Sequence, residues 1–514
     1  MRYRTLVTLA LVASVVGTQV PAQGTAGQTQ PALSVGERIA IARLREARAA
    51  GDGFTNPNVP DFDPAHYPSV IYEPGEWAVA AGFMQAPPGF AAIEGVEVAG
   101  KPVWRAPDGT FVPPKTGRRS PARLWGEWAV IAEISAPQVL LSEDHTGRIS
   151  GEEWLSGFLA DGYMLYLMRQ RKAETPYVAA PVVWPDSAEL AALSALQQRL
   201  IMRSGRMHVT EKNVADWYAL LAQLVAVTHE RRRVLGPELT AREHAVELTD
   251  GVRHWVVTLL PRLGLLGGFE RTPIHESDPT FHGYADSPVL RSALSYETLI
   301  AFPDSPASSR RQIATRAGEI INLIEMLKLW SWRVDLVAGI RPLIDQVGDR
   351  ISYKIEEEPA HLQKGKADNG YDLALSLAAS DLEVLRRGRE ALLATTFPPG
   401  KERLEIQLAS PVTWTGPPEG SSWLGEGRWL VTSELSLDTP ALRLRKTAQG
   451  SPVLVREGDR PGTVSGLLLV IPPGQQPTQK TASRFSATPA GLEVSLTGGS
   501  LSIGPDGTGR LSLP

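Results

Sequence analysis

The hydrophobic residues of this 514-residue chain change their spacing near residue 402, and that change constrains the fold more than any other feature. Before it, apolar residues recur every three or four positions, which is typical of helices with one buried face. After it, apolar and polar residues alternate, which is typical of strands with one buried face. The sequence therefore predicts an α+β multidomain protein, with a helical body followed by a C-terminal antiparallel β-sandwich.

The predicted helical domain covers residues 123–395. Several of its helices open with the pattern of a capping box, in which a short polar residue and an acidic residue three positions later satisfy backbone N–H groups. These patterns begin at Asp186, Thr240 and Ser380. An apolar repeat that starts near Pro306 predicts a longer helix, which ends before Pro342.

The predicted β-sandwich covers residues 402–514. Short alternating runs such as LEIQL, ALRLRK and LEVSL are separated by Gly, Pro and Asp, which favour turns. Ser500 to Leu513 is interpreted as a hairpin around the sequence GPDGTG. The junction Thr395–Glu402, with two prolines and a glycine, is predicted to be a linker between the two domains.

The first 122 residues differ from the helical domain in composition. A basic start, an apolar run and small residues ending at Ala22 predict a secretory signal peptide at residues 1–22. Residues 23–122 are predicted to form a leader, a short helix that begins at Ser34, and a Pro/Gly-rich arm over the surface. The pentapeptide Gly-Glu-Trp-Ala-Val occurs at Gly75 and again at Gly126, and is interpreted as two helix starts that each bury a tryptophan.

The composition limits the chemistry and the partners. The chain contains no cysteine, which excludes thiol catalysis and zinc held by cysteine. Its net charge is −4, and Lys and Arg are spread along the chain, so we expect no nucleic-acid partner. After the signal peptide no apolar run is long enough for a transmembrane segment. We therefore expect an exported protein, which is periplasmic, at the cell surface or extracellular.

The segment SEDHTGRISGEE, residues 142–153, carries a recognisable chemical pattern. It resembles the calcium-binding loop of an EF-hand, with Gly147 at the sharp turn and an amphipathic segment after it. The resemblance covers roughly thirty residues. It implies side-chain ligands and one backbone carbonyl ligand, namely Ser142, Asp144, Thr146, Arg148 (carbonyl), Ser150 and Glu153. The family has Asp where this chain has Ser142, so the implied cofactor is calcium, held weakly.

The same residues have a second interpretation. Ser150-x-x-Glu153 is also a capping box, which begins a helix without any metal. Capping accounts for Ser150 and Glu153, but it does not account for Asp144, Gly147 and Ile149, which match the EF-hand positions. The sequence leaves both interpretations open.

Histidines and acidic residues are concentrated in the polar segment HESDPTFHGYAD, residues 275–286. Imidazole and carboxylate groups bind zinc and serve as general acids and bases. The spacing matches no metalloprotease motif, and the chain has no nucleophile-elbow or P-loop motif. The candidate catalytic residues are His275, Glu276 and His282, with Asp278 and Asp286 beside them.

These observations support two hypotheses about function. The first is an exported, non-catalytic structural or binding protein of the cell envelope or extracellular space, whose partner is an envelope protein or a polysaccharide. The alternative is a secreted hydrolase with its site in the helical domain near residues 275–286. A deep pocket in which the histidines and acids converge favours the hydrolase, and a filled surface favours the first hypothesis.

Overall fold

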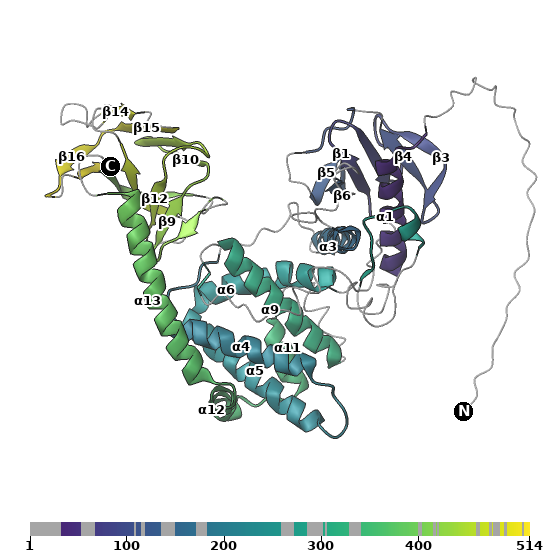
Figure 1. Cartoon of the computed structure of the whole chain (residues 1–514), viewed down its shortest axis with the longest axis horizontal. Helices are drawn as coiled ribbons and strands as arrows, with labels where there is room; N and C mark the ends of the chain where they lie inside the picture. The colour runs from purple at the N-terminus through teal and green to yellow at the C-terminus, as the bar shows by residue number, and fades with distance from the viewer. Residues whose placement is uncertain are drawn as a thin grey trace, which may run out of the picture.

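The structure is a computed structural model, and it describes residues 32–52, 67–106, 109–114, 119–134, 150–170, 182–258, 272–284, 302–303, 306–327, 341–398, 403–414, 418, 421–458, 463–471, 475, 484–487, 491–505 and 508–513. The predicted signal peptide, Asp286 and the predicted metal positions 142–148 lie outside these residues. Figure 1 shows an N-terminal sheet with two helices, a central group of helices, and further strands at the C-terminal end. None of the described helices has an apolar stretch long enough to cross a membrane.

A six-stranded sheet follows the first helix, α1 (Val35–Asp52). Its strands are β1 (Ser69–Glu73), β2 (Trp77–Ala81), β3 (Ala91–Val98), β4 (Lys101–Ala106), β5 (Arg119–Leu124) and β6 (Glu127–Glu133). They lie in the order β3-β4-β2-β1-β6-β5, and only β1 and β6 are parallel neighbours. The sheet corrects the prediction of an extended arm, because the Pro/Gly-rich segments are turns between short strands.

The repeated pentapeptide lies at two hairpins rather than at two helix starts. Trp77 begins β2, and Trp128 is the second residue of β6. Gly75 and Gly126 lie in the turns before these strands, with φ angles of 77° and 89° that favour glycine. The prediction of two helices is therefore wrong, because the glycine that resembled a helix boundary is a turn residue.

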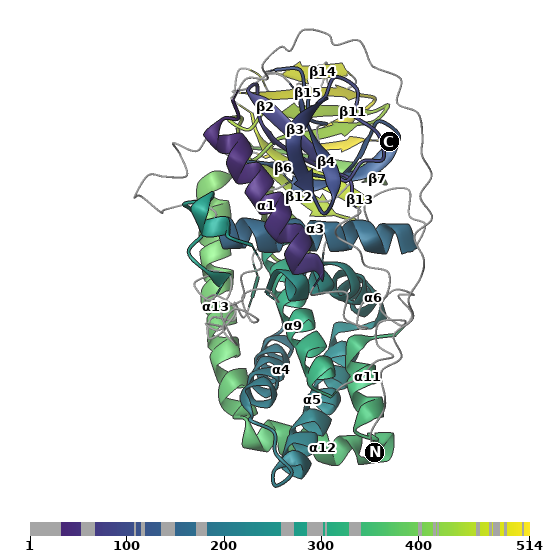
Figure 2. The ribbon, with the colours of Figure 1, turned by 90° about the vertical axis from the view of Figure 1, so that its right-hand side faces the viewer.

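Two helices, α1 and α3 (Gly151–Gln170), pack on one face of this sheet and against each other (Figure 2). The start of α1 is a complete capping box, as the sequence predicts. Ser34 Oγ accepts a hydrogen bond from the backbone N–H of Glu37 at 3.2 Å, and Glu37 Oε2 accepts one from that of Ser34 at 2.7 Å. A separate apolar cluster lies on the other face of the sheet.

The central helices confirm the predicted 3.6-residue periodicity. They are α4 (Ala188–Arg206), α5 (Val214–Leu235), α6 (Pro237–Val246), the π-helical turn η2 (Glu247–Gly251), the 3-10 turn η3 (Ile274–Glu276), α9 (Pro306–Met326), α11 (Leu343–Arg350), η5 (Ile355–Glu357), α12 (Glu358–Asp368) and α13 (Tyr371–Thr396). Three predicted caps are wrong. The cap of α4 is Ser187, whose hydroxyl accepts a hydrogen bond from the backbone N–H of Leu190 at 3.2 Å, rather than Asp186. Thr240 lies inside α6, which begins at Pro237 after Gly236, and Ser380 lies inside α13.

The C-terminal strands form two sheets. They are β7 (Arg403–Thr413), β8 (Ser422–Trp423), β9 (Arg428–Val431), β10 (Leu435–Asp438), β11 (Leu442–Lys446), β12 (Val453–Glu457), β13 (Thr463–Val470), β14 (Arg484–Ala487), β15 (Leu492–Thr497), β16 (Ser500–Ile503) and β17 (Gly509–Leu513). The orders are β10-β11-β15-β14 and β16-β17-β7-β13-β12-β9-β8. The predicted β16–β17 hairpin is confirmed. β17 and β7 are parallel, which corrects the prediction of a wholly antiparallel structure, because the final hairpin returns along the first strand.

The end of α13 is attached to the seven-stranded sheet. Phe397 is 2% exposed and packs in one cluster with Leu424, Leu430, Leu454 and Leu468. The described part of the predicted linker Thr395–Glu402 is therefore an anchor, because a buried aromatic side chain fixes the helix to the sheet.

Candidate functional site

The loop at residues 272–284, which contains the predicted catalytic residues, is fixed to α1 by a buried ion pair. Asp278 is fully buried, and its Oδ2 accepts a hydrogen bond from Arg43 Nε at 2.6 Å. Arg43 also donates to Thr280 Oγ1 at 2.9 Å and stacks over the ring of Trp154. Thr280 in turn donates to Asp278 Oδ1 from its backbone and its hydroxyl. The carboxylate of Asp278 is thus used inside the fold.

A carboxylate on α1 holds both ends of the same loop. Glu46 is fully buried. Its Oε2 accepts hydrogen bonds from the backbone N–H and the hydroxyl of Thr272 at 2.8 and 2.7 Å. Its Oε1 accepts one from the hydroxyl of Tyr284 at 2.8 Å. The loop therefore closes over Arg43 and Glu46, one turn apart on α1.

The candidate catalytic residues face different partners. His275 Nδ1 lies 3.0 Å from the carbonyl oxygen of Phe281, so it carries the proton of that hydrogen bond. The backbone N–H of His282 donates to Glu152 Oε2 at 3.2 Å, and its ring lies 3.8 Å from the other oxygen of that carboxylate. Glu276 is exposed. Among the residues that the structure describes, no three His, Asp or Glu side chains are grouped to hold a metal ion.

The described end of the EF-hand-like segment begins α3. Ser150 Oγ accepts a hydrogen bond from the backbone N–H of Glu153 at 3.3 Å, as the predicted cap requires. Gly151 donates to the carbonyl oxygen of Thr280 at 3.1 Å. A Cβ at this glycine would lie 2.9 Å from Asp278 Oδ2, so the loop and the start of α3 pack in close contact.

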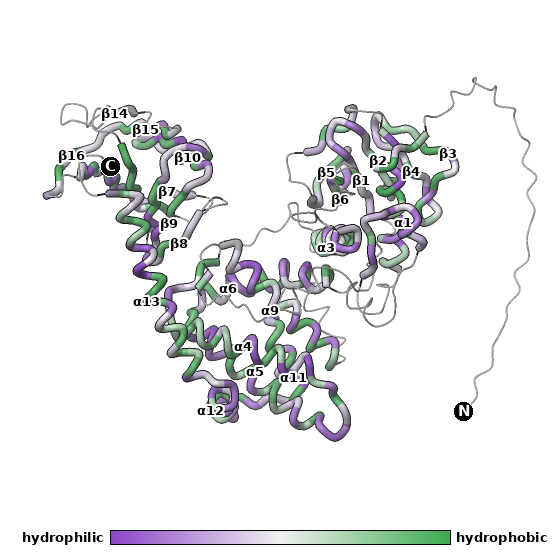
Figure 3. The backbone as a smooth tube through the Cα atoms, viewed as in Figure 1, coloured by the Kyte–Doolittle hydropathy of each residue, from purple (hydrophilic) through white to green (hydrophobic). Residues whose placement is uncertain are grey.

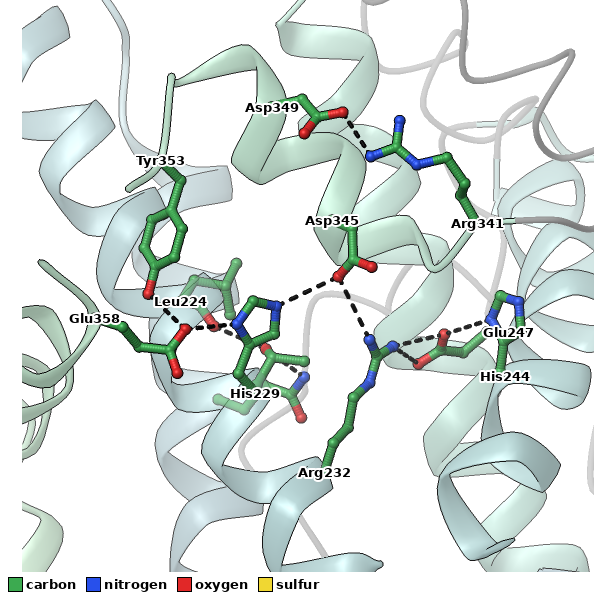
Figure 4. A network of polar contacts seen from close by, with 12 residues as sticks. Leu224, His229, Arg232, His244, Glu247, Arg341, Asp345, Asp349, Tyr353 and Glu358 are labelled. Carbon is green, nitrogen blue, oxygen red and sulfur yellow. Dashed lines mark hydrogen bonds and ion pairs between the residues drawn. The ribbon is translucent and has the colours of Figure 1, made fainter. Parts of the chain in front are cut away.

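A polar network that the sequence analysis missed joins α5, α11 and α12 (Figure 4). His229 Nδ1 lies 2.7 Å from Glu358 Oε2, and its Nε2 lies 3.3 Å from Asp345 Oδ1. The hydroxyl of Tyr353 donates to the same Glu358 oxygen at 3.0 Å. Since both ring nitrogens face carboxylate oxygens, this geometry fits a doubly protonated imidazolium. The hydrogen bond to Asp345 is the largest cause that raises the pKa of His229, and Glu358 adds to it against the effect of burial.

The network continues along α5 to Glu247, on the π-helical turn. Arg232 lies 3.8 Å from Asp345 and donates to both oxygens of Glu247, at 3.1 and 3.2 Å. Burial alone raises the pKa of Glu247, but the neighbouring Arg232 and His244 outweigh burial and lower the pKa to about 2. The carboxylate therefore stays ionised.

A more deeply buried charge cluster lies beside this network. Arg231 forms two hydrogen bonds of 2.6 Å with Glu243, which also accepts one from the indole N–H of Trp184. The guanidinium groups of Arg231 and Arg316 lie 4.9 and 4.7 Å from the Trp184 ring centre. Burial, followed by repulsion from Arg231, lowers the pKa of Arg316 to about 9. No local sequence pattern marks these residues, because they come together from distant parts of the chain.

An aromatic cluster lies at three turns of the N-terminal sheet. The ring of Trp125, at the β5–β6 turn, lies 5.5, 5.4 and 6.2 Å from the rings of Phe83, Phe90 and Phe111. Trp125 is 41% exposed and has a φ of 49°, a conformation that is strained for a large side chain. The neighbouring residues Met84 and Val112 are 81% and 82% exposed. This part of the sheet therefore presents apolar side chains to solvent.

No family model, no curated protein and no solved structure matches this chain.

Proposed function

We propose that this chain is an exported, non-catalytic protein of the cell envelope or extracellular space that binds an envelope protein or a polysaccharide. The observation that supports the proposal most is that buried contacts fix the loop at residues 272–284 to α1. Its buried carboxylate, Asp278, forms an ion pair with Arg43, and both loop ends bind Glu46. Asp278 and the two ends of the loop therefore have a structural role: they form a tertiary clamp, a set of buried contacts that fixes the loop to α1.

The aromatic cluster supports binding as the activity. The described turn residues 82–90 and 109–114 and the Trp125-Gly126 turn contain no charged residue. A solvent-exposed apolar patch of this kind marks a site for a partner. Because these described turn residues carry no charge, we propose an uncharged segment of an envelope protein or a neutral polysaccharide as the ligand. We further propose that the two C-terminal sheets form a sandwich used for attachment. Its support is one apolar core with inward residues from both sheets.

A binding experiment tests this proposal. Purified protein is mixed with insoluble envelope polysaccharide and, separately, with solubilised envelope proteins, and the bound fraction is measured. Trp125→Ala should reduce binding at least tenfold, since truncation of a central aromatic contact commonly costs more than about 1.4 kcal/mol. Ile503→Ala, on the C-terminal sheets, is the matched control and should bind normally. Equal binding by both variants would contradict the assignment of the partner to this patch.

The hydrolase alternative is tested directly as well. Wild-type protein and the double variant His275→Ala/Glu276→Gln are assayed against a broad panel of hydrolase substrates. Our proposal predicts no turnover that depends on these two residues. Turnover that is present in the wild type and lost in the double variant would overturn the proposal and support the alternative.

We also propose that residues 142–153 bind calcium weakly. The support is the position of α3, which begins at Gly151, so that Glu153 lies in its first turn where an EF-hand places its last ligand. Calcium at about ten times its Kd should stabilise the fold by roughly 1.4 kcal/mol. Asp144→Ala should abolish this gain, and Ser142→Asp should increase the affinity.

The control separates calcium binding from helix capping. Ser150→Ala removes the cap and should cost about 1 kcal/mol even when calcium is removed by a chelator. Asp144→Ala should leave the stability unchanged without calcium. If thermal unfolding of Ser142→Asp shows no shift in millimolar calcium, the segment is a helix cap only.

A further inference from the structure

The helix α13 has apolar residues on two opposite sides. The inner side packs on α4 and buries residues such as Ala374, Ala378 and Leu382. The outer side exposes Leu373, Leu377 and Val384, by 63%, 53% and 67%. An ordinary surface helix has one apolar stripe and a polar opposite face. The outer side of α13 therefore has the composition of a second contact face.

The exposed apolar residues share one face. Leu377 lies four residues after Leu373, and Val384 lies eleven residues after it. An α-helix has about 3.6 residues per turn, so these spacings place the three side chains on nearly the same side of the helix. The residues between and beyond them on this face, Ser380 and Gly388, are small and exposed. Figures 1 and 2 show α13 along the outside of the central helices, and Figure 3 shows hydrophobic residues recurring along its length.

The charges beside this face indicate what covers it. Glu383 and Arg387 lie on one edge of the face and form an exposed ion pair, with 2.8 Å between Arg387 Nη2 and Glu383 Oε1. The midpoint of the pair is Leu385, near the middle of the helix. A two-fold axis through this point places a second α13 antiparallel to the first, with Glu383 facing Arg387 of the partner subunit. The two-fold rotation generates this contact twice, so two glutamates and two arginines alternate in sign across the axis.

We propose that α13 is the interface of a homodimer in which two copies of this helix pack antiparallel about Leu385. Leu392 of the partner subunit, which is 42% exposed, then lies one residue from the level of Leu377, and Val384 lies beside the axis. The small side chains of Ser380 and Gly388 allow the two helices to approach closely. A Cβ at Gly388 would meet nothing within 4 Å inside the chain, so this position is open to a partner. The inference is independent of the binding function proposed above.

Analytical ultracentrifugation of the full chain tests the interface. We expect the wild type to sediment as a dimer at micromolar concentration, and Val384→Glu to raise the dimer dissociation constant at least a hundredfold. Ile503→Glu changes an equally exposed residue, 74% exposed on β16, and should remain dimeric. The charge reversals Glu383→Arg and Arg387→Glu should each weaken the dimer, and the double reversal should restore it. A monomeric wild type, or equal dissociation of both Glu variants, would overturn the proposal.

The orientation has its own test, because the chain has no native cysteine. In the antiparallel arrangement, Val384→Cys lies beside its own copy and should form a disulfide-linked dimer under mild oxidation. Leu373→Cys lies twelve residues from Leu385, so the two copies are about 36 Å apart and should not cross-link. Cross-linking of Leu373→Cys as readily as Val384→Cys would indicate parallel helices and contradict the proposed axis. Circular dichroism checks that both variants are folded.

Discussion

His229 shows how a single residue holds three elements of the central helices together. Its two ring nitrogens contact Asp345 on α11 and Glu358 on α12, while the residue itself lies on α5. Arg232 also approaches Asp345, and Tyr353 binds Glu358 and has its ring next to that of His229. A protonated His229 carries a positive charge that offsets the negative charges of Asp345 and Glu358, whereas a neutral imidazole carries none. The residue is therefore a charge-dependent contact between helices.

The raised pKa of His229 predicts a pH dependence of stability. The contribution is fully present below the ordinary histidine pKa of about 6.5, and it is lost as the pH rises through the higher pKa of the folded state. Urea unfolding should therefore show a large difference between wild type and His229→Gln at about pH 6 and a smaller one at alkaline pH. His208→Gln, at an exposed histidine, is the control and should show little effect at either pH. A difference that grows with pH would have the opposite sign and contradict this assignment.

At the scale of elements, close contact between the π-helical turn and α9 depends on one glycine. A Cβ added to Gly251 would lie 2.3 Å from the Cβ of Ala317. Gly251→Ala should therefore destabilise the protein by about 1–3 kcal/mol, because the two helices must separate. Gly162, inside α3, has nothing within 4 Å of its added Cβ. Gly162→Ala should be neutral or stabilise by up to about 1 kcal/mol, since alanine favours helix. Chemical denaturation measures both, and equal effects would contradict the contact.

The elements also show what local sequence can predict. The capping box at Ser34 is confirmed because its two hydrogen bonds involve residues three apart. The same pattern at Thr240 and Ser380 fails, because an acidic residue three positions after Ser or Thr is also common inside helices. The N-terminal strands were missed because their turns are rich in Pro and Gly. The strands β1 and β2 are buried on both faces, so their sequences lack the apolar–polar alternation that identified the C-terminal strands.

At the scale of the whole molecule, the contacts that define the candidate site are long-range. Arg43 and Asp278 are 235 residues apart in sequence, and His229 and Glu358 are 129 apart. The sequence located the polar loop correctly, but it gave no indication that α1 carries the partners of that loop. A buried ion pair depends on the tertiary fold, so the local sequence marked one member, Asp278, but not its partner Arg43. The core of the C-terminal sheets, by contrast, follows from alternation within each strand.

If the loop at residues 272–284 is a tertiary clamp rather than a reaction site, its buried ion pair must stabilise the folded protein. The most direct test is the free energy of unfolding of two variants of this loop, measured in urea by tryptophan fluorescence. Asp278→Ala leaves Arg43 buried without its carboxylate, so we predict a loss of about 3–5 kcal/mol. Glu276→Ala changes an exposed carboxylate in the same loop and should stay within about 0.5 kcal/mol of wild type. An Asp278→Ala protein as stable as the wild type would contradict the claim.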